Sequence, residues 1–571
     1  MARSTNGQSD YLIIGAGSAG CVLANRLSED PDTTVTLVEA GGNDRHLFVR
    51  MPSAFYLPIG KRRFDWCLRS EPEPYLNHRR LQCPRGRVLG GSSSINGMVY
   101  VRGHPLDFER WAASGAKDWD YAHCLPYFRR AQSAAEVTSP DLYRGHEGLL
   151  KTTTGRFHSP LFQLFLEATE QAGYARSADL NGYLQEGFGK LPMTVAGGER
   201  VSAATAYLAP ARRRSNLVVR TATQALKILL EGQRAVGAQV RRAGKVQVLR
   251  ANKAVILCAG AIHSPHLLLL SGIGDPQQLE QCGVPVRQPL PGVGRNLMDH
   301  LEVYVQHAAT QPVSIYQHLS LIGRAGIGAR WLLNRSGLGA TNHFEAGGFT
   351  RSDSSVSYPD IQFHFLPAAM SYDGSVKAKG HGYQVHVGPM LSPSRGSVTL
   401  ASPDPLSAPR IAFNYMSCPE DWRVFRSAIK QAREIFAQPA FAQVRGTELA
   451  PGYQARTDAQ LDAFVRAHAE SAYHPCGTCR MGEDPESVVD SQGRVHALQG
   501  LRVVDASVFP HITNGNLNAP TIMLAERMAD LIRGRQLAPE PQVFYAGAEQ
   551  ATQAGPLQQR PKGALPGAGN H

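Results

Sequence analysis

A glycine-rich segment near the N-terminus has the residue types and spacing that bind the pyrophosphate of a dinucleotide. Gly15, Gly17 and Gly20 match the pattern G-x-G-x-x-G. The segment follows an apolar run expected to be a strand, Asp10–Ile14, and it opens a helical pattern, Ser18–Leu27. The first glycine permits a tight turn, the second lets a pyrophosphate touch the backbone, and the third lets the helix pack on the strand, with the helix N-terminus toward the phosphate charge.

An acidic residue at the correct distance strengthens this interpretation. Glu39 stands 19 residues after Gly20, at the end of the next apolar run, Thr34–Val38. A carboxylate there accepts hydrogen bonds from both ribose hydroxyls and repels a 2′-phosphate. We expect Ser18 and Glu39 to bind the cofactor together with the three glycines, although this pattern does not separate FAD from NAD.

A second segment, Gly86–Gly97, is dense in glycine and serine. Such a loop exposes backbone N–H groups and short hydroxyl donors, which suit a pyrophosphate and the edge of an isoalloxazine ring. An ordinary surface loop is the alternative interpretation. The cofactor candidates in this segment are Arg87, Gly91, Ser93 and Asn96.

Composition limits the classes of protein that the chain can be. It has 571 residues, 43% hydrophobic and 19% charged, which is typical of a soluble globular protein with two lobes. The net charge of +12 favours anionic surfaces such as nucleic acid or acidic lipid, although a solvated basic surface is the ordinary explanation. Basic stripes interleaved with aromatic residues are not evident, so no nucleic-acid partner is expected.

Cysteine usage and hydropathy predict a cytoplasmic protein. The nine cysteines are an odd number and scattered, which indicates free thiols in a reducing compartment. Cys476 and Cys479 have CxxC spacing, but no second pair accompanies them, so no metal site is expected. No signal peptide or transmembrane segment is recognisable, which leaves peripheral contact with the inner face of the cell membrane as the expected form of membrane association.

The motifs together resemble the glucose–methanol–choline (GMC) oxidoreductase family. The segment Gly86–Gly97 is similar to its first signature, and residues 260–274 are similar to its second. The stretches Tyr473–Thr478 and Asn516–Pro520 are similar to its C-terminal pair, so the resemblance runs from residue 10 to about residue 534. It implies FAD as the cofactor. Some members attach FAD through a histidine beside the signature asparagine, where this chain has Ile95, so the FAD should be non-covalent.

The resemblance implies an α/β fold, in which a Rossmann-type FAD-binding domain carries an inserted α+β substrate-binding domain built on an antiparallel sheet. Buried strands are expected at Ala254–Leu257 and at Leu501–Val504, which is followed by the cofactor candidate Asp505, and a helix is expected at Thr521–Arg533. The predicted FAD-binding parts are residues 8–155, 201–310 and 461–535, the last with the active site. The predicted substrate domain comprises residues 156–200 and 311–460, followed by a disordered tail at 536–571.

The resemblance also assigns the catalytic roles. His474 is the expected base that removes a hydroxyl proton, and Asn518 is the expected amide donor to the alkoxide. A satisfied core histidine and a helix cap are the alternative interpretations of these two residues. Glu345 aligns with a carboxylate that holds a quaternary ammonium, with Tyr473 as an aromatic wall and Trp66 and Trp331 as weaker candidates.

Several stretches, including residues 71–74, 342–349 and 392–396, are similar to members of the family that oxidise choline. The expected reaction is therefore choline to betaine aldehyde, and then to the osmoprotectant glycine betaine, by proton abstraction and hydride transfer to the flavin. The expected electron acceptor is a respiratory-chain quinone. A dehydrogenase of uncharged primary alcohols, an oxidase that uses oxygen and a non-catalytic flavoprotein remain alternatives.

Overall fold

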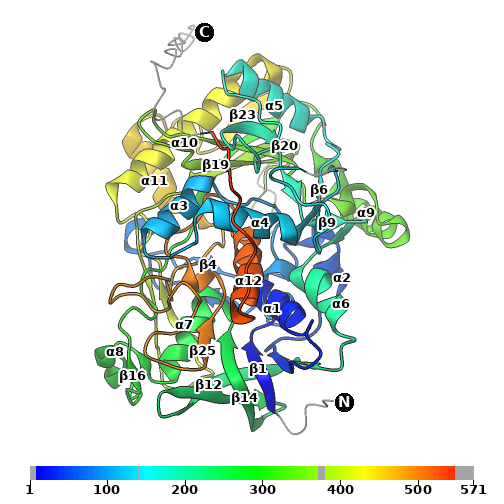
Figure 1. Cartoon of the computed structure of the whole chain (residues 1–571). Coiled ribbons are helices and arrows are strands. Elements are labelled where there is room, and N and C mark those ends of the chain that lie inside the picture. Colours follow the sequence, from blue (N-terminus) through cyan, green and yellow to red (C-terminus); the bar gives the residue numbers. More distant parts are fainter. Residues whose placement is uncertain (1–7, 138–140, 371–379, 547–571) are drawn as a thin grey trace.

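The computed structural model describes residues 8–137, 141–370 and 380–546. Two seven-stranded sheets dominate it, one in the lower half of Figure 1 and one in the upper half. The first is mostly parallel and flanked by helices, and the second is antiparallel. The predicted fold class is confirmed.

The first sheet has the strand order β11-β2-β1-β14-β13-β12, with β25 beside β14. The central parts of its parallel strands, residues 12–14, 35–38 and 254–257, are mostly apolar and buried, as strands covered on both faces must be. They are β1 (Gln8–Ile14), β2 (Val35–Val38), β11 (Leu217–Arg220), β14 (Lys245–Leu257) and β25 (Leu501–Val503). The antiparallel strands β12 (Thr223–Glu231) and β13 (Arg234–Arg242) extend the sheet.

Helices begin where two neighbouring parallel strands of this sheet end. β1 is followed by α1 (Ser18–Leu27), and β14 is followed by α7 (Gly260–Leu270). Because β1 and β14 pair in parallel, both helix N-termini lie at the same edge of the sheet, where a phosphate is stabilised. The long buried helix α12 (Asn518–Ile532) packs against α1, so its N-terminus reaches this edge as well.

The second sheet has the order β23-β17-β20-β19-β18-β7, with β24 beside β17. These strands are β7 (Gly187–Lys190), β17 (Leu301–Ala309), β18 (Ala346–Thr350), β19 (Ile361–Leu366), β20 (Gly382–Pro389), β23 (Arg445–Ala450) and β24 (Glu470–Ser471). Helices α10 (Pro419–Ala437) and α5 (Leu161–Gln171) pack with its apolar side chains in one core.

Strict alternation along β17, β19 and β20 gives this sheet two different faces. Val303, Phe363 and Val385 point into the core beneath the helices. Their neighbours Glu302, His364 and His386 point to the opposite face and line a cleft, because successive side chains of a strand leave on opposite sides.

Two predicted boundaries are wrong. Residues 201–310 were assigned to the cofactor domain, but β17 lies in the second sheet, where it pairs with β20. The tail was expected to be disordered from residue 536, yet Leu537 and Tyr545 pack on the first core and Glu540 pairs with Arg129. Residues 547–571 lie outside the described residues.

The remaining elements are short or peripheral. The helices are α2 (Leu47–Arg50), α3 (Pro105–Ala113), α4 (Tyr121–Ala131), α6 (Ala209–Ala211), α8 (Pro276–Gln281), α9 (Leu321–Asn334) and α11 (Asp458–His468). The strands are β3 (Leu68–Arg69), β4 (Gln82–Cys83), β5 (Gln132–Ala134), β6 (Leu150–Thr154), β8 (Pro192–Met193), β9 (Val195–Ala196), β10 (Glu199–Arg200), β15 (Ile273–Gly274), β16 (Gln288–Pro289), β21 (Ser397–Thr399) and β22 (Arg410–Ala412).

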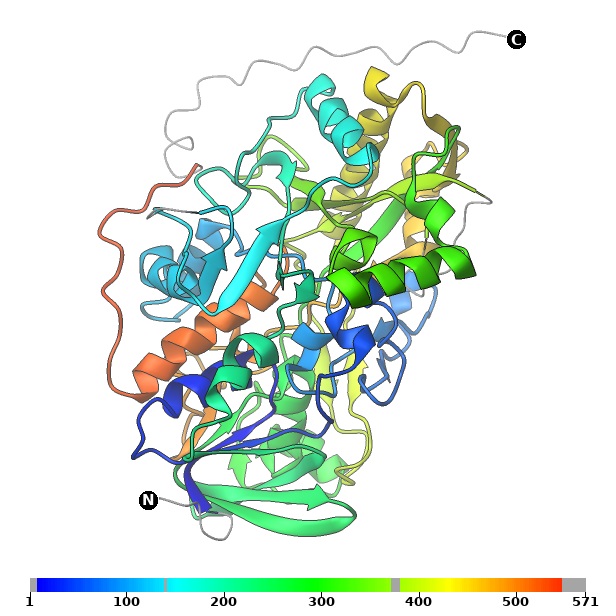
Figure 2. The ribbon, with the colours of Figure 1, turned by 90° about the vertical axis from the view of Figure 1, so that its right-hand side faces the viewer.

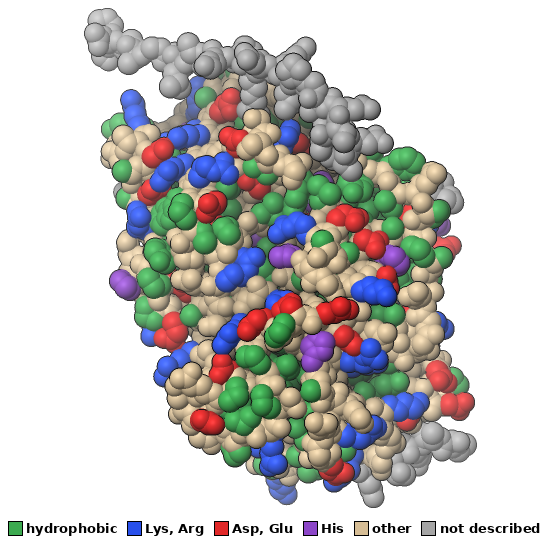
Figure 3. All heavy atoms as spheres, turned by 60° about the vertical axis from the view of Figure 1, so that its left-hand side comes forward, with side chains coloured by type: hydrophobic (Ala, Val, Ile, Leu, Met, Phe, Trp, Pro, Cys, Tyr) green, Lys and Arg blue, Asp and Glu red, His purple; other side chains and the backbone are tan. Residues whose placement is uncertain are grey.

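The surface carries charges of both signs. On the face seen in Figure 3, basic and acidic side chains are interspersed. Within the described part of the chain, no helix is both long enough and apolar enough to cross a bilayer.

Candidate active site

A cleft of about 840 Å³ lies between the two sheets, within the size range of cofactor and ligand sites. Its walls come from the turn after β1, the segment 86–97, the ends of β14 and β25, and the polar face of the second sheet. Residues far apart in the sequence therefore meet around one cavity.

Three of the predicted glycines, Gly15, Gly20 and Gly91, are required because backbone meets backbone at the cleft. A Cβ on Gly15 would lie 2.5 Å from the carbonyl oxygen of Cys258, and one on Gly20 would lie 1.9 Å from that of Gly15. Gly91 has φ +54°, and its Cβ would lie 2.6 Å from the Cα of Gly17. The two predicted cofactor segments are thus in direct contact and form one backbone-lined cradle, which fits a pyrophosphate.

Two buried carboxylates stabilise this cradle. Glu39 accepts hydrogen bonds from the N–H groups of Ala16 (3.0 Å) and Gly41 (2.8 Å), and burial raises its pKa to about 7. Asp505 accepts from the N–H of Gly260 (2.9 Å) and the hydroxyl of Ser264 (2.6 Å), which fixes the start of α7 beside β25. Burial raises the pKa of Asp505 as well.

The polar residues of the segment 86–97 hold the loop in shape. Ser93 donates to the carbonyl of Gly90 (2.6 Å) and accepts from the N–H of Ala203 (2.9 Å). The side-chain oxygen of Asn96 accepts from Arg200 at 2.7 Å. Both residues line the cleft, so the loop that they hold in shape forms part of the wall of the cofactor cradle.

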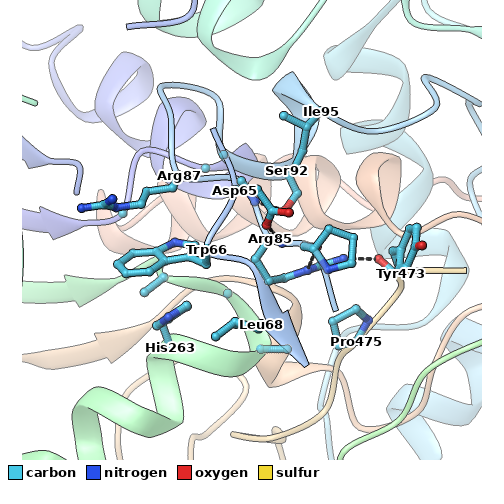
Figure 4. A pocket seen from close by; sticks show the side chains of 18 of the residues that line it. Asp65, Trp66, Leu68, Arg85, Arg87, Ser92, Ile95, His263, Tyr473 and Pro475 are labelled. Carbon is cyan, nitrogen blue, oxygen red and sulfur yellow. Dashed lines mark hydrogen bonds between the residues drawn. The ribbon is translucent and has the colours of Figure 1, made fainter. Parts of the chain in front are cut away.

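Figure 4 shows the aromatic and cationic wall of the cleft. The ring of Trp66 lies over His263, with centroids 4.3 Å apart, and the guanidinium of Arg87 lies 5.1 Å from the Trp66 centroid. Arg85 donates to the backbone carbonyl of Tyr473 at 2.5 Å, and Ile95 also lines the cavity.

The structure places Asn516, and not Asn518, against His474. The amide nitrogen of Asn516 lies 3.1 Å from Nε2 of His474. Asn518 instead accepts a hydrogen bond from the hydroxyl of Ser18 (2.7 Å) at the first turn of α12, where it faces the cofactor cradle. Asn518 was expected beside the base, and the structure puts Asn516, two residues earlier in the same motif, in that place; the catalytic role stays a prediction.

His474 belongs to a chain of hydrogen bonds in which every proton has a defined place. Nε2 of His300 lies 3.0 Å from the carbonyl of Met390, which can only accept, so this nitrogen carries a proton. Burial lowers the pKa of His300 to about 4, and burial together with His300 lowers that of His474 well below its usual value, so both rings are neutral. Nδ1 of His300 therefore accepts the Nδ1 proton of His474 across 3.1 Å.

The lone pair of His474 consequently stands on Nε2, at the cleft. Asn516 supports this assignment, because its side-chain oxygen lies 3.3 Å from the amide nitrogen of Gln362, a pure donor, which turns its own amide nitrogen toward His474. The backbone N–H of His474 donates to the buried carboxylate of Asp299 at 2.6 Å. This lone pair accepts the amide N–H of Asn516 at the wall of the cleft. A neutral imidazole with its lone pair on this nitrogen can act as a general base when a substrate hydroxyl takes the place of that amide.

Glu302, and not Glu345, is the carboxylate that the second sheet directs into the cleft. Glu345 is fully buried and accepts hydrogen bonds from the N–H of Phe157 (2.6 Å) and the hydroxyl of Thr341 (2.6 Å), outside the cleft. Its neighbour Phe344 lines the cleft, because adjacent residues of the extended chain point in opposite directions. Glu302 lies 2.9 Å from Nδ1 of His386 on the cleft-facing side of the second sheet.

Of the three aromatic candidates, two line the cleft and one does not. Tyr473 lines the cleft beside the base, and Trp66 lines it at the opposite wall. Trp331 is 1% exposed, packs against Met51 and Ala54 and does not line the cleft.

Sequence reasoning missed Asn516, Glu302 and His300. Asn516 stood inside the recognised motif, and only the register of the turn before α12 decides which amide faces the base. Asp299, His300 and Glu302 form a cluster of ionisable residues immediately before and within an apolar strand. Such residues are rarely buried without a function, so this cluster was a usable signal.

Models of the GMC oxidoreductase family match residues 9–302 and 392–525, so the chain belongs to the GMC oxidoreductases. Among curated proteins, it is 52% identical over 531 residues to the oxygen-dependent choline dehydrogenase of Rhizobium etli, covering 93% of this chain and 96% of that protein. It is 50% identical over 550 residues to the protein of the same name from Chromohalobacter salexigens, covering 95% and 98%.

Solved structures share the fold. Pyridoxine 4-oxidase from "Mesorbium loti" superposes with a TM-score of 0.84 at 32% identity, covering 93% of this chain and all of that chain. A formate oxidase from Aspergillus oryzae superposes with a TM-score of 0.87 at 25% identity, covering 94% and 99%.

We predict that the affinity of the cofactor-free protein for FAD rises with pH up to about 7. Below its pKa of about 7 the Glu39 carboxyl is protonated, and it must lose that proton before it accepts both ribose hydroxyls. The dissociation constant, measured by quenching of flavin fluorescence, should rise by up to about tenfold per pH unit below 7. Glu39→Gln should bind more weakly with no such slope, and an unchanged slope would contradict the role of Glu39.

Proposed function

We propose that this chain oxidises choline to betaine aldehyde with FAD as its hydride acceptor. The observation that carries the proposal is that a neutral base, His474, and a buried carboxylate, Glu302, line the same cleft beside a dinucleotide cradle. Family membership and the choline dehydrogenases at 50–52% identity support the same substrate.

FAD, when bound, supplies a ring that accepts the hydride. The contacting turns at Gly15–Gly20 and Gly91 would hold its pyrophosphate, and Glu39 would hold its ribose. Asp505 fixes the N-terminus of α7, which would add a backbone N–H to this site. Ile95 offers no nucleophile, so we infer that the cofactor is non-covalent.

His474 and Asn516 divide the work on the hydroxyl group. A hydroxyl placed between them gives its proton to Nε2 of His474, which leaves an alkoxide, and the negative charge weakens the adjacent C–H bond for hydride departure. Asn516 donates an amide N–H to the developing charge. The histidine has its lone pair on the correct nitrogen before substrate arrives, so no proton has to be rearranged.

Glu302 and the aromatic residues account for the substrate cation. A trimethylammonium group has no N–H to donate and is stabilised by an anion and by aromatic faces. Phe344 lies 5.4 Å from the ring of His386, the partner of Glu302, so an apolar face and a negative charge adjoin one another. Tyr473 adds a second ring beside the base. The bound cation also stabilises the alkoxide and disfavours protonation of His474 before the reaction.

The second oxidation, to glycine betaine, uses the same groups. Betaine aldehyde in water forms a hydrate, whose hydroxyl presents the same proton and the same C–H bond to His474. The product is the osmoprotectant that the sequence resemblance implies.

The electron acceptor forms a separate part of the proposal. We propose a respiratory-chain quinone, as expected from the sequence, while the relatives' name, oxygen-dependent choline dehydrogenase, favours oxygen as the second candidate. Rates of reoxidation of the reduced protein by a soluble quinone and by dissolved oxygen distinguish the two.

Glu302→Gln should abolish the preference for a cation. Choline and 3,3-dimethyl-1-butanol have the same shape, because a tert-butyl group replaces the trimethylammonium, so their ratio of kcat/KM isolates the charge. Loss of a buried carboxylate–cation pair should lower the kcat/KM for choline by about 10²- to 10³-fold and leave that for the alcohol within about threefold.

Glu345→Gln is the matched control, because it removes a buried carboxylate that points away from the cleft, next in sequence to the cleft-lining Phe344. Its ratio of kcat/KM values should stay that of the unmodified protein, whatever it does to stability. Equal losses for both substrates in Glu302→Gln would refute the cation site.

His300→Leu should slow flavin reduction by choline about 10²-fold with little change in KM, because His474 loses the acceptor that keeps its proton on Nδ1. His300→Asn should recover most of the rate, since its side-chain oxygen can accept that proton. Stopped-flow reduction under nitrogen measures both. Equal rates in the two variants, with unchanged melting temperatures, would show that His300 does not position the base.

A further inference from the structure

Helix α9 lies on the outside of the molecule in both ribbon views (Figure 1, Figure 2). It is attached mainly through Trp331, which is 1% exposed, packs on Met51 and Ala54 and donates its indole N–H to the carbonyl of Gly198 at 2.6 Å. The contacts of Trp331 thus fix which face of the helix points toward the protein and which face points toward solvent.

The outward face of α9 is apolar, which reverses the usual pattern of a surface helix. Leu321, Ile322 and Leu333 are 88%, 87% and 81% exposed, the three highest values among large hydrophobic residues in the described part of the chain. With successive residues 100° apart, the face spans about 140° and contains no polar side chain. Its exposed members are Leu321, Ile322, Ala325, Gly326, Ala329, Leu332 and Leu333.

Basic residues border this apolar face. Arg335, which follows the helix, is paired with Glu199 at 2.6 Å. Arg324 and Arg330 are exposed and flank the apolar face on its two sides by the same 100° spacing. From residue 303 to residue 344 the chain contains no aspartate or glutamate, so no acidic residue in this segment offsets them.

We propose that α9 docks the protein on a membrane surface that contains anionic lipid. Its apolar face enters the boundary between headgroups and acyl chains, and Arg324 and Arg330 meet the lipid phosphates. At 14 residues the helix is about 21 Å long, too short to cross the hydrocarbon core, so it lies in the interface plane. A second copy of the chain fits less well, because antiparallel pairing of two such faces brings arginines of like charge together.

The docking face adjoins the cleft. Trp331 packs on the 3₁₀ turn Pro52–Ala54, and the next residues, Phe55 and Ile59, line the cleft. A membrane-bound protein would therefore hold its cofactor site close to the lipid surface. The docking inference rests on α9 alone and stands whether or not choline is the substrate.

The test is co-sedimentation of the FAD-loaded protein with vesicles of phosphatidylcholine alone and of phosphatidylcholine with 30% phosphatidylglycerol. The unmodified protein should bind the anionic vesicles and be released by about 0.5 M salt. The triple variant Leu321→Ser, Ile322→Ser, Leu333→Ser should bind at least about tenfold more weakly. Arg324→Gln with Arg330→Gln should lose the preference for anionic vesicles.

The matched control is Val246→Ser with Val248→Ser. These two valines of β14 are 59% and 48% exposed and lie on a different element from α9. It should bind as the unmodified protein does. Flavin absorbance and melting temperature establish that each variant is folded. Vesicle binding unaffected by the triple variant would overturn the proposal, and so would a dimer in solution that the triple variant dissociates without any vesicle binding.

Discussion

The carbonyl oxygen of Met390 can accept a hydrogen bond but cannot donate one, and the chemistry of the cleft depends on that restriction. Because of it, His300 carries its proton on Nε2 and accepts a hydrogen bond at Nδ1. His474 must then carry its own proton on Nδ1, so its lone pair is on Nε2, the nitrogen at the cleft. Burial keeps both rings neutral. A base with a defined tautomer therefore needs no acidic partner. The nearest carboxylates have other contacts: Asp299 accepts from the backbone N–H of His474, and Glu302 lines the cleft.

The two sheets position different halves of the reaction. The parallel sheet ends at a cradle where glycine backbones touch, so it can bind a dinucleotide but contributes no base. The antiparallel sheet uses strict alternation to fill its core with one set of side chains and to present histidines and a glutamate with the other. Met390 follows β20 and His300 precedes β17, so the register between these two strands sets the geometry of the base.

The sequence predicted what depends on local pattern. The glycine spacing, Glu39 and the buried strands follow from chemistry that neighbouring residues dictate, whereas His474 was assigned from the family resemblance. Asn518 and Glu345 were misplaced because a shift of one or two residues turns a side chain from the cleft to the core, and only packing decides between them. The boundary at residue 310 was wrong because β17 joins the second sheet through pairing with β20, a contact between segments far apart in the sequence. The exposed leucines of α9 could not be recognised from sequence, because an apolar helix is ordinarily buried.

The most direct measurement is the visible spectrum of the purified protein before and after choline is added under nitrogen. The structure predicts a flavin spectrum that bleaches with choline and far less with 3,3-dimethyl-1-butanol at the same concentration. Bleaching by the uncharged alcohol alone would retain His474 and the cofactor cradle and remove the cation site at Glu302. A protein that stays colourless after FAD is added would contradict the cofactor assignment itself.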